Sequence, residues 1–136
     1  MKHLHLFVAH FLLVSLPLLA AQTDAPDCRA LTTQADINRY AYEDFLVANG
    51  EQAAVLKSLT QGLAAPDRQR LRAAQKSWII WRVAQCGFET GGTSGGSARE
   101  LARWSCSDEL TRERTIALDK AANCLEGDIA CPGRKS

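Results

Sequence analysis

The side chains that could carry chemistry in this 136-residue chain are unevenly distributed. Its three histidines, His3, His5 and His10, all lie in the first ten residues, ahead of an apolar run. If that segment is a signal peptide and is removed, no imidazole remains to activate a serine or cysteine nucleophile or to bind zinc. We therefore expect no metal and no other cofactor.

Two pairs of adjacent carboxylates, Glu43–Asp44 and Asp108–Glu109, are the remaining candidates for acid–base chemistry. Neighbouring residues on a helix point about 100° apart, so neither pair converges on one reacting atom. We therefore expect no catalytic residue and a protein that is not an enzyme. Turnover abolished by Glu43→Gln or Asp44→Asn in a folded protein would contradict this expectation.

Cysteine is the other reactive residue type, and all five cysteines follow the apolar run: Cys28, Cys86, Cys106, Cys124 and Cys131. In an exported chain, disulfides are the first interpretation of such a set. Cys86 and Cys106 flank a glycine-rich segment, so antiparallel helices on either side would bring them together, and closing that loop stabilises by roughly 3 kcal/mol. Cys124 with Cys131 is a possible second pair; a bond from Cys28 to the C-terminal segment is the alternative.

The first 21 residues have the layout of a secretory signal peptide. Lys2 supplies the positive charge, an apolar region follows, and Ala21 ends the segment. Gln22 follows instead of a cysteine, so no lipid-attachment motif is present. We expect a periplasmic or secreted protein with no stable membrane insertion after cleavage, and a flexible spacer over residues 22–27.

Composition limits the remainder to one domain without a net charge, although local charged patches remain possible. Of 16 basic residues, one is Lys2, which leaves 15 against 15 acidic residues after cleavage and no net field to attract nucleic acid. No segment alternates apolar and polar residues long enough to predict a strand. The predicted fold is all-α, a small antiparallel bundle of three to four helices stapled by disulfides, over residues 28–126 with a C-terminal tail at 127–136.

Start and stop signals divide the domain into helices. The first helix is expected to begin after Thr32 or Thr33, and whether it breaks at Gly50 is left open. Pro66 begins the second helix. Ser97 and Glu100 have the spacing of a capping box that opens a third helix, which is expected to end near residue 125.

The second helix is apolar on most sides around Trp78 and Trp81, which predicts that both tryptophans belong to the core. Arg82 lies within this apolar stretch. Because an uncompensated buried guanidinium is costly, a carboxylate partner is expected, and Asp44 on the first helix is the candidate.

A polar, glycine-rich segment joins the second and third helices and lies between Cys86 and Cys106. Such a segment cannot be regular structure, and it is either a plain connector or a partner-binding loop beside a helix N-terminus. The predicted contact residues are Gly91, Gly92, Thr93, Ser94, Gly95, Gly96, Ser97, Arg99 and Arg103.

The second helix also carries a family signature. Residues 71–78 read Leu-Arg-Ala-Ala-Gln-Lys-Ser-Trp, followed by Trp81-Arg82 and then Cys86. This pattern resembles the LprI-type lysozyme-inhibitor domain family. The Gly-Gly-Ser loop, Cys106 and the Leu-Thr pair at 110–111 are also similar to that family. The resemblance implies a small, exported helical protein of bacterial envelopes that inhibits lysozyme.

The leading hypothesis is therefore an exported, non-enzymatic binding protein that blocks lysozyme or a related peptidoglycan hydrolase through the glycine-rich loop. The alternative is an envelope immunity or assembly factor that binds a different protein partner. Lysozyme inhibition by the purified protein distinguishes the two.

Overall fold

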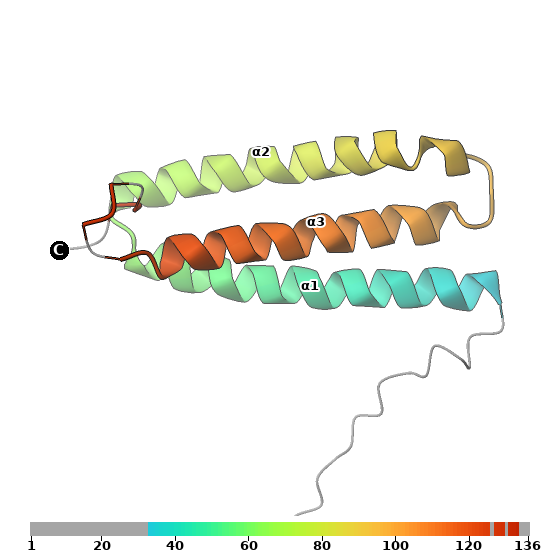
Figure 1. The fold of residues 1–136 in the computed structure, drawn as a ribbon, viewed down its shortest axis with the longest axis horizontal. Coiled ribbons are helices and arrows are strands. Elements are labelled where there is room, and N and C mark those ends of the chain that lie inside the picture. The colour runs from blue at the N-terminus through green and yellow to red at the C-terminus, as the bar shows by residue number, and fades with distance from the viewer. Residues whose placement is uncertain (1–32, 126, 130, 134–136) are drawn as a thin grey trace, which may run out of the picture.

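A computed structural model describes residues 33–125, 127–129 and 131–133 of the chain. The predicted signal peptide at 1–21, the spacer at 22–27 and Cys28 lie outside these residues. Consecutive helices run antiparallel in the order α1 (Gln34–Gly62), α2 (Ala65–Glu89) and α3 (Arg99–Ala122), so that α1 and α3 point the same way, and a short 3₁₀ helix, η2 (Gly91–Thr93), follows α2 (Figure 1). The predicted all-α, disulfide-linked bundle is confirmed, with three α-helices among the described residues.

Helix α1 begins where the sequence predicts. Thr33 is its N-cap, and the hydroxyl oxygen accepts a hydrogen bond from the backbone N–H of Asp36. The helix continues through Gly50 without a break. A glycine inside a helix costs about 1 kcal/mol, and packing of the flanking Ala48 and Gln52 against the bundle interior offsets that cost.

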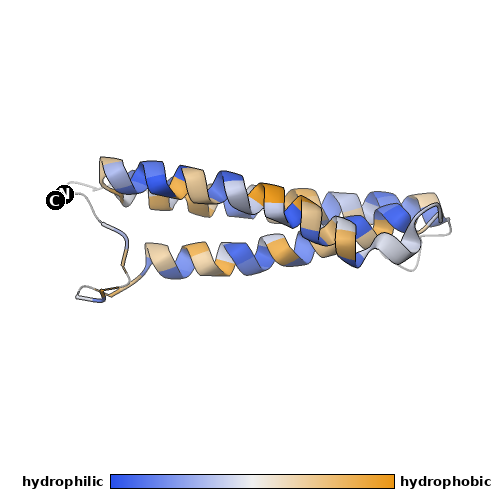
Figure 2. Cartoon of the chain, turned by 90° about the horizontal axis from the view of Figure 1, so that it is seen from above, coloured by the Kyte–Doolittle hydropathy of each residue, from blue (hydrophilic) through white to orange (hydrophobic). Residues whose placement is uncertain are grey.

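The closest packing in the bundle is between α1 and α3, which lie side by side over most of their length (Figure 1). One end of the core is a cluster of Leu59, Leu63 and Leu118, all almost fully buried. Helix α2 lies farther out, and its only buried residues are Arg82 and Cys86. Hydrophobic and hydrophilic residues are interleaved along the helices (Figure 2), as expected when each helix buries one face.

The end of the chain folds back on the junction between α1 and α2. Helix α3 ends at Ala122, three residues before the predicted limit. A disulfide joins Cys124 to Cys131, with the Cα atoms 5.9 Å apart, which confirms the possible second pair. The backbone N–H of Ala64 donates to the carbonyl of Gly133 at 3.0 Å. The described part of the predicted tail at 127–136 is therefore attached to the helices at two points.

Candidate functional site

The glycine-rich loop occupies one end of the bundle, between the last turn of α2 and the first turn of α3 (Figure 1). Its first half is the single turn η2, in which the hydroxyl of Thr93 donates to the carbonyl of Thr90 at 2.7 Å. Gly95 has φ +80°, a conformation that favours glycine. The exposed residues of the loop include Gly91, Gly92, Ser94, Gly95 and Gly96. Because four of these five are glycines, the loop presents mostly backbone to solvent.

Two contacts hold the base of this loop. Cys86 of α2 is bonded to Cys106 of α3, with the Cα atoms 5.7 Å apart, as the sequence predicts. On the other side, the amide of Asn38 on α1 donates to the carbonyl of Ser97 at 2.9 Å. The loop is thus tied to all three helices, and its conformational freedom is limited to the tip.

The predicted capping box is wrong. Helix α3 begins at Arg99 with Ala98 as N-cap, and no side chain caps it. Ser97 instead accepts the bond from α1 through its backbone carbonyl. Glu100 pairs with Arg103 at 2.8 Å one turn along the same helix. No side chain of the described residues therefore accepts a hydrogen bond from the backbone N–H groups in the first turn of α3.

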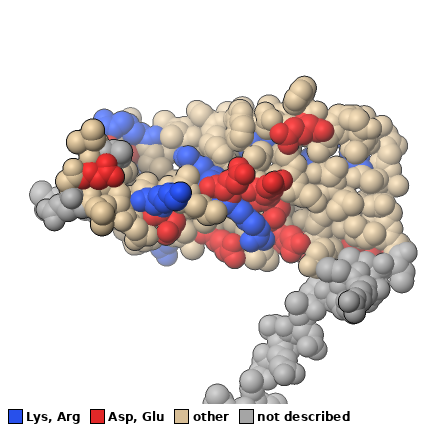
Figure 3. Space-filling view, viewed as in Figure 1, with Lys and Arg blue, Asp and Glu red and all other residues tan. Residues whose placement is uncertain are grey.

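The two predicted contact arginines differ in their surroundings. Arg99 is exposed beside the loop. Arg103 is half-buried: it bridges to Glu100, and its guanidinium lies 4.2 Å from the ring centre of Trp104. On the face seen in Figure 3, acidic and basic side chains intermingle over the middle of the bundle, and the loop end is largely uncharged. Arg99 is therefore the loop's more accessible cation.

The expected ion pair between Asp44 and Arg82 is not formed. Arg82 donates to the hydroxyl of Thr111 at 2.6 Å, and its guanidinium lies 5.0 Å from the ring centre of Phe45 and 4.9 Å from that of Trp78. Adjacent helix positions point in different directions, so Phe45 faces Arg82 while Asp44 does not. Among the described residues, no carboxylate lies within 4.0 Å of the Arg82 guanidinium.

Asp44 points about 100° away from Phe45 around α1 and lies beside α3. It lines a small cavity of about 220 Å³ together with Asp108. Arg112 donates a hydrogen bond to the carboxylate of Asp108, which raises the pKa of the guanidinium, and the negative charges of Glu51 and Asp44 add to that effect.

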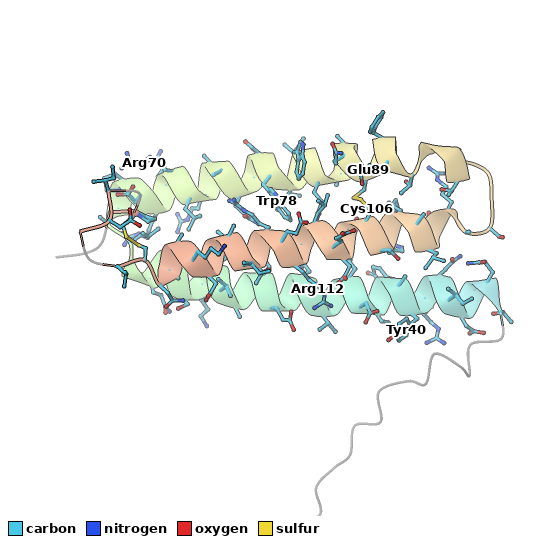
Figure 4. All side chains as sticks on the ribbon, viewed as in Figure 1. Tyr40, Arg70, Trp78, Glu89, Cys106 and Arg112 are labelled. Atoms are coloured by element: carbon cyan, nitrogen blue, oxygen red, sulfur yellow. A yellow bond between two sulfur atoms is a disulfide. The ribbon has the colours of Figure 1, made fainter. Side chains whose placement is uncertain are left out.

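Trp81 does not belong to the core, which corrects the sequence prediction. Its side chain is 47% exposed, whereas Trp78 is half-buried and points from α2 into the space between α2 and α3 (Figure 4). Other apolar side chains of α2 are also exposed, with Ile80 63%, Val83 64% and Phe88 81% exposed. Sequence periodicity detects apolar positions but not which of them the chain itself covers.

A buried polar network that the sequence did not predict joins the three helices beside Arg82. Gln75 donates to the side-chain oxygen of Gln52 at 2.8 Å, and Gln52 donates to the backbone carbonyl of Thr111 at 3.4 Å. Arg114 donates to Gln75 at 3.3 Å. Burial lowers the pKa of both Arg82 and Arg114. The available signal was the position of Gln75 three residues before Trp78, on the inward face of α2.

Among the described residues, no three His, Cys, Asp or Glu side chains converge as metal ligands. In the same part of the chain, no helix is both long enough and apolar enough to cross a membrane. What the structure offers is an anchored loop, exposed apolar side chains on α2 and a set of partly buried arginines.

These features define a small disulfide-linked helical protein built around a Trp-x-x-x-Arg-x-x-x-Cys helix. Residues 27–118 match the family model described as "Lysozyme inhibitor LprI", and the chain belongs to that family. The chain is also 31% identical over 122 residues to "Uncharacterized protein R02472" of Rhizobium meliloti (strain 1021), in an alignment covering 78% of this chain and 86% of that protein. No solved structure matches.

Proposed function

We propose that this protein is an exported, non-enzymatic inhibitor of lysozyme or a related peptidoglycan hydrolase, and that the loop at residues 91–97 enters the cleft of its target. Family membership supports the target class. The observation that supports the loop as the contact surface is its structure: it is exposed at its tip and held at its base by the Cys86–Cys106 disulfide and by Asn38. An anchored loop loses little conformational entropy on binding, which favours affinity.

The chemistry of the loop suits the cleft of a glycoside hydrolase. Such clefts carry two carboxylates and many hydrogen-bonding groups for sugars. Exposed backbone N–H groups at Gly92 and Gly95, together with the guanidinium of Arg99, offer donors and positive charge to those carboxylates. Glycine at the tip keeps the loop slim enough to enter a cleft.

Inhibition assays with the oxidised protein, residues 22–136, test this proposal. Cell-wall lysis by several types of lysozyme is measured with increasing protein, and saturable inhibition of at least one type is expected. Arg99→Glu should weaken inhibition about tenfold or more, because it replaces a favourable charge contact with a repulsive one. Lys120→Glu, a charge reversal in the last turn of α3, is the matched control. Absence of inhibition at micromolar protein would contradict the proposal.

A second candidate function is an envelope immunity or assembly factor with a different protein partner. The exposed apolar side chains of α2, among them Ile80, Val83 and Phe88, favour it, because large apolar side chains left exposed on a small protein are available to an interaction partner. This candidate predicts a specific partner that co-purifies with the wild-type chain and is lost with Val83→Lys, while lysozyme stays active in the presence of the protein.

A further inference from the structure

A small pocket between the three helices has two arginines in its lining. Its volume is about 280 Å³. Phe45 of α1 and Trp104 of α3 supply aromatic walls, and Arg82 and Arg103 supply positive charge. Cys86 of the disulfide also lines it, so the pocket lies directly below the base of the loop.

Arg82 is a buried cation without a counter-ion among the described residues. Only 8% of its surface is exposed. The rings of Phe45 and Trp78 lie near its guanidinium, the hydroxyl of Thr111 accepts from one terminal nitrogen, and Nε is buried with no hydrogen-bond partner. A buried donor left unpaired costs free energy, and a buried charge without an opposite charge costs more. An anion beside this side chain would remove both costs.

The positive charge and the N–H donors of Arg103 are only partly paired. One terminal nitrogen contacts Glu100 at 2.8 Å, while its Nε is buried without a partner. The charges of Arg82, Arg103 and Glu100 sum to one positive charge, so the pocket suits a monovalent anion. The aromatic walls favour an anion with an apolar body over a hydrated inorganic ion.

We propose that this pocket binds one organic carboxylate, with the carboxylate group between Arg82 and Arg103 and its apolar part against Phe45 and Trp104. Guanidinium groups match the planar geometry of carboxylates, which makes this pairing stronger than a contact to a neutral acceptor. The pocket is smaller than the sites that enclose drug-sized ligands. Its occupant is therefore either a small free carboxylate or a single acidic side chain of a protein partner.

Titration with sodium benzoate at constant ionic strength tests the site. The ¹⁵N-labelled protein is followed through its arginine Nε–H resonances, and saturable shifts of Arg82 and Arg103 are expected. Arg103→Gln should weaken benzoate binding about tenfold, because it removes one charge-assisted contact. Arg112→Gln, which alters an exposed ion-paired arginine on α3, should leave the affinity unchanged. The fold of each variant is checked by circular dichroism.

Three outcomes would overturn the proposal. One is the absence of saturable shifts with benzoate, which would mean that water alone solvates the pocket. Another is equal affinity for sodium phosphate, because the site would then lack the stated selectivity. The third is equal benzoate affinity in Arg103→Gln, because Arg103 would then not contact the carboxylate. None of these measurements involves a hydrolase, so they are independent of the proposed function.

A further arm of the experiment identifies the source of the carboxylate. If a lysozyme is inhibited, the assay is repeated with saturating benzoate. Relief of inhibition indicates that an acidic side chain of the enzyme enters the pocket. Unchanged inhibition indicates a free carboxylate that binds independently of the enzyme.

Discussion

Arg82 of α2 donates to the hydroxyl of Thr111 on α3 at 2.6 Å, between two helices that pack less closely than α1 and α3 do. Thr111 is fully buried, and its hydroxyl also donates to the carbonyl of Ser107. A neutral hydroxyl thus occupies the place where the sequence predicts a carboxylate. Such polar contacts, together with the disulfide from Cys86, attach α2 to the other two helices.

Replacing Thr111 with valine should destabilise the protein by about 1–3 kcal/mol, because Arg82 then loses its hydrogen-bonded partner inside the bundle. Thr60→Val is the matched control, since Thr60 bonds only to a carbonyl of its own helix. It should change stability by less than about 0.5 kcal/mol. Urea unfolding measures both, and equal effects would show that the Arg82 contact contributes little.

The two tryptophans of α2 should differ in their contributions to stability. Trp78→Ala removes a half-buried ring that contacts Arg82 and Arg114 and should cost about 2–4 kcal/mol. Trp81→Ala removes an exposed ring and should cost less than about 1 kcal/mol. Thermal unfolding of the two variants measures the difference. A larger effect at Trp81 would contradict the described orientation of α2.

The conformation of the loop should depend on Gly95. Gly95→Ala places a side chain at φ +80° and should cost about 1–2 kcal/mol. Gly92→Ala meets no atom within 4 Å and has no such strain, so it should be neutral or slightly stabilising. Guanidinium unfolding compares the two. If the loop is the inhibitory surface, Gly95→Ala should also weaken inhibition more than Gly92→Ala does.

Removing the two disulfides should have different consequences. Cys86→Ser with Cys106→Ser opens the loop base and should lower the free energy of unfolding by about 3 kcal/mol. Cys124→Ser with Cys131→Ser opens a shorter loop and should cost about 2 kcal/mol. Only the first pair should weaken inhibition, because only it anchors the loop. Peptide mapping without reduction verifies both bonds in the parent protein.

The start of α1 should be sensitive to acid. The hydroxyl of Thr33 donates to the carboxylate of Asp36 at 2.6 Å, and this bond, with a contact from Arg39, lowers the pKa of Asp36. Because the folded pKa is depressed, the stabilisation is present above the ordinary carboxyl pKa and is lost as pH falls through the folded value. Thr33→Val should raise the pKa, and Thr33→Ser should restore it. An NMR titration of the Asp36 carboxyl measures each value.

Local signals in the sequence were sufficient for the elements of the fold. Thr33 and Pro66 mark helix starts through capping and backbone geometry, and the glycine run marks the turn. The bond between Cys86 and Cys106 followed from their positions on either side of that turn. These features depend on residues close together in the chain, which is why spacing alone predicts them.

The arrangement of the helices was not predictable in the same way. Helix α2 is apolar on most sides around Trp78 and Trp81, which placed Trp81 in the core, yet α1 and α3 form the closest pair. The partner of Arg82 depends on the rotation of α1, which brings Phe45 rather than Asp44 to face it. The arginine-lined pocket depends on all three helices together. Such relationships depend on residues that are far apart in the chain, so no local sequence pattern predicts them.

The positions of the two disulfides bear on when the fold becomes complete. Neither disulfide involves α1, which packs closely against α3 without one. One disulfide joins α2 to α3, which pack less closely, and the other lies in the segment after α3. A reduced chain would therefore keep its paired first and third helices but present an incompletely assembled loop and pocket. We therefore expect the loop and the pocket to be fully assembled only in a compartment where thiols are oxidised.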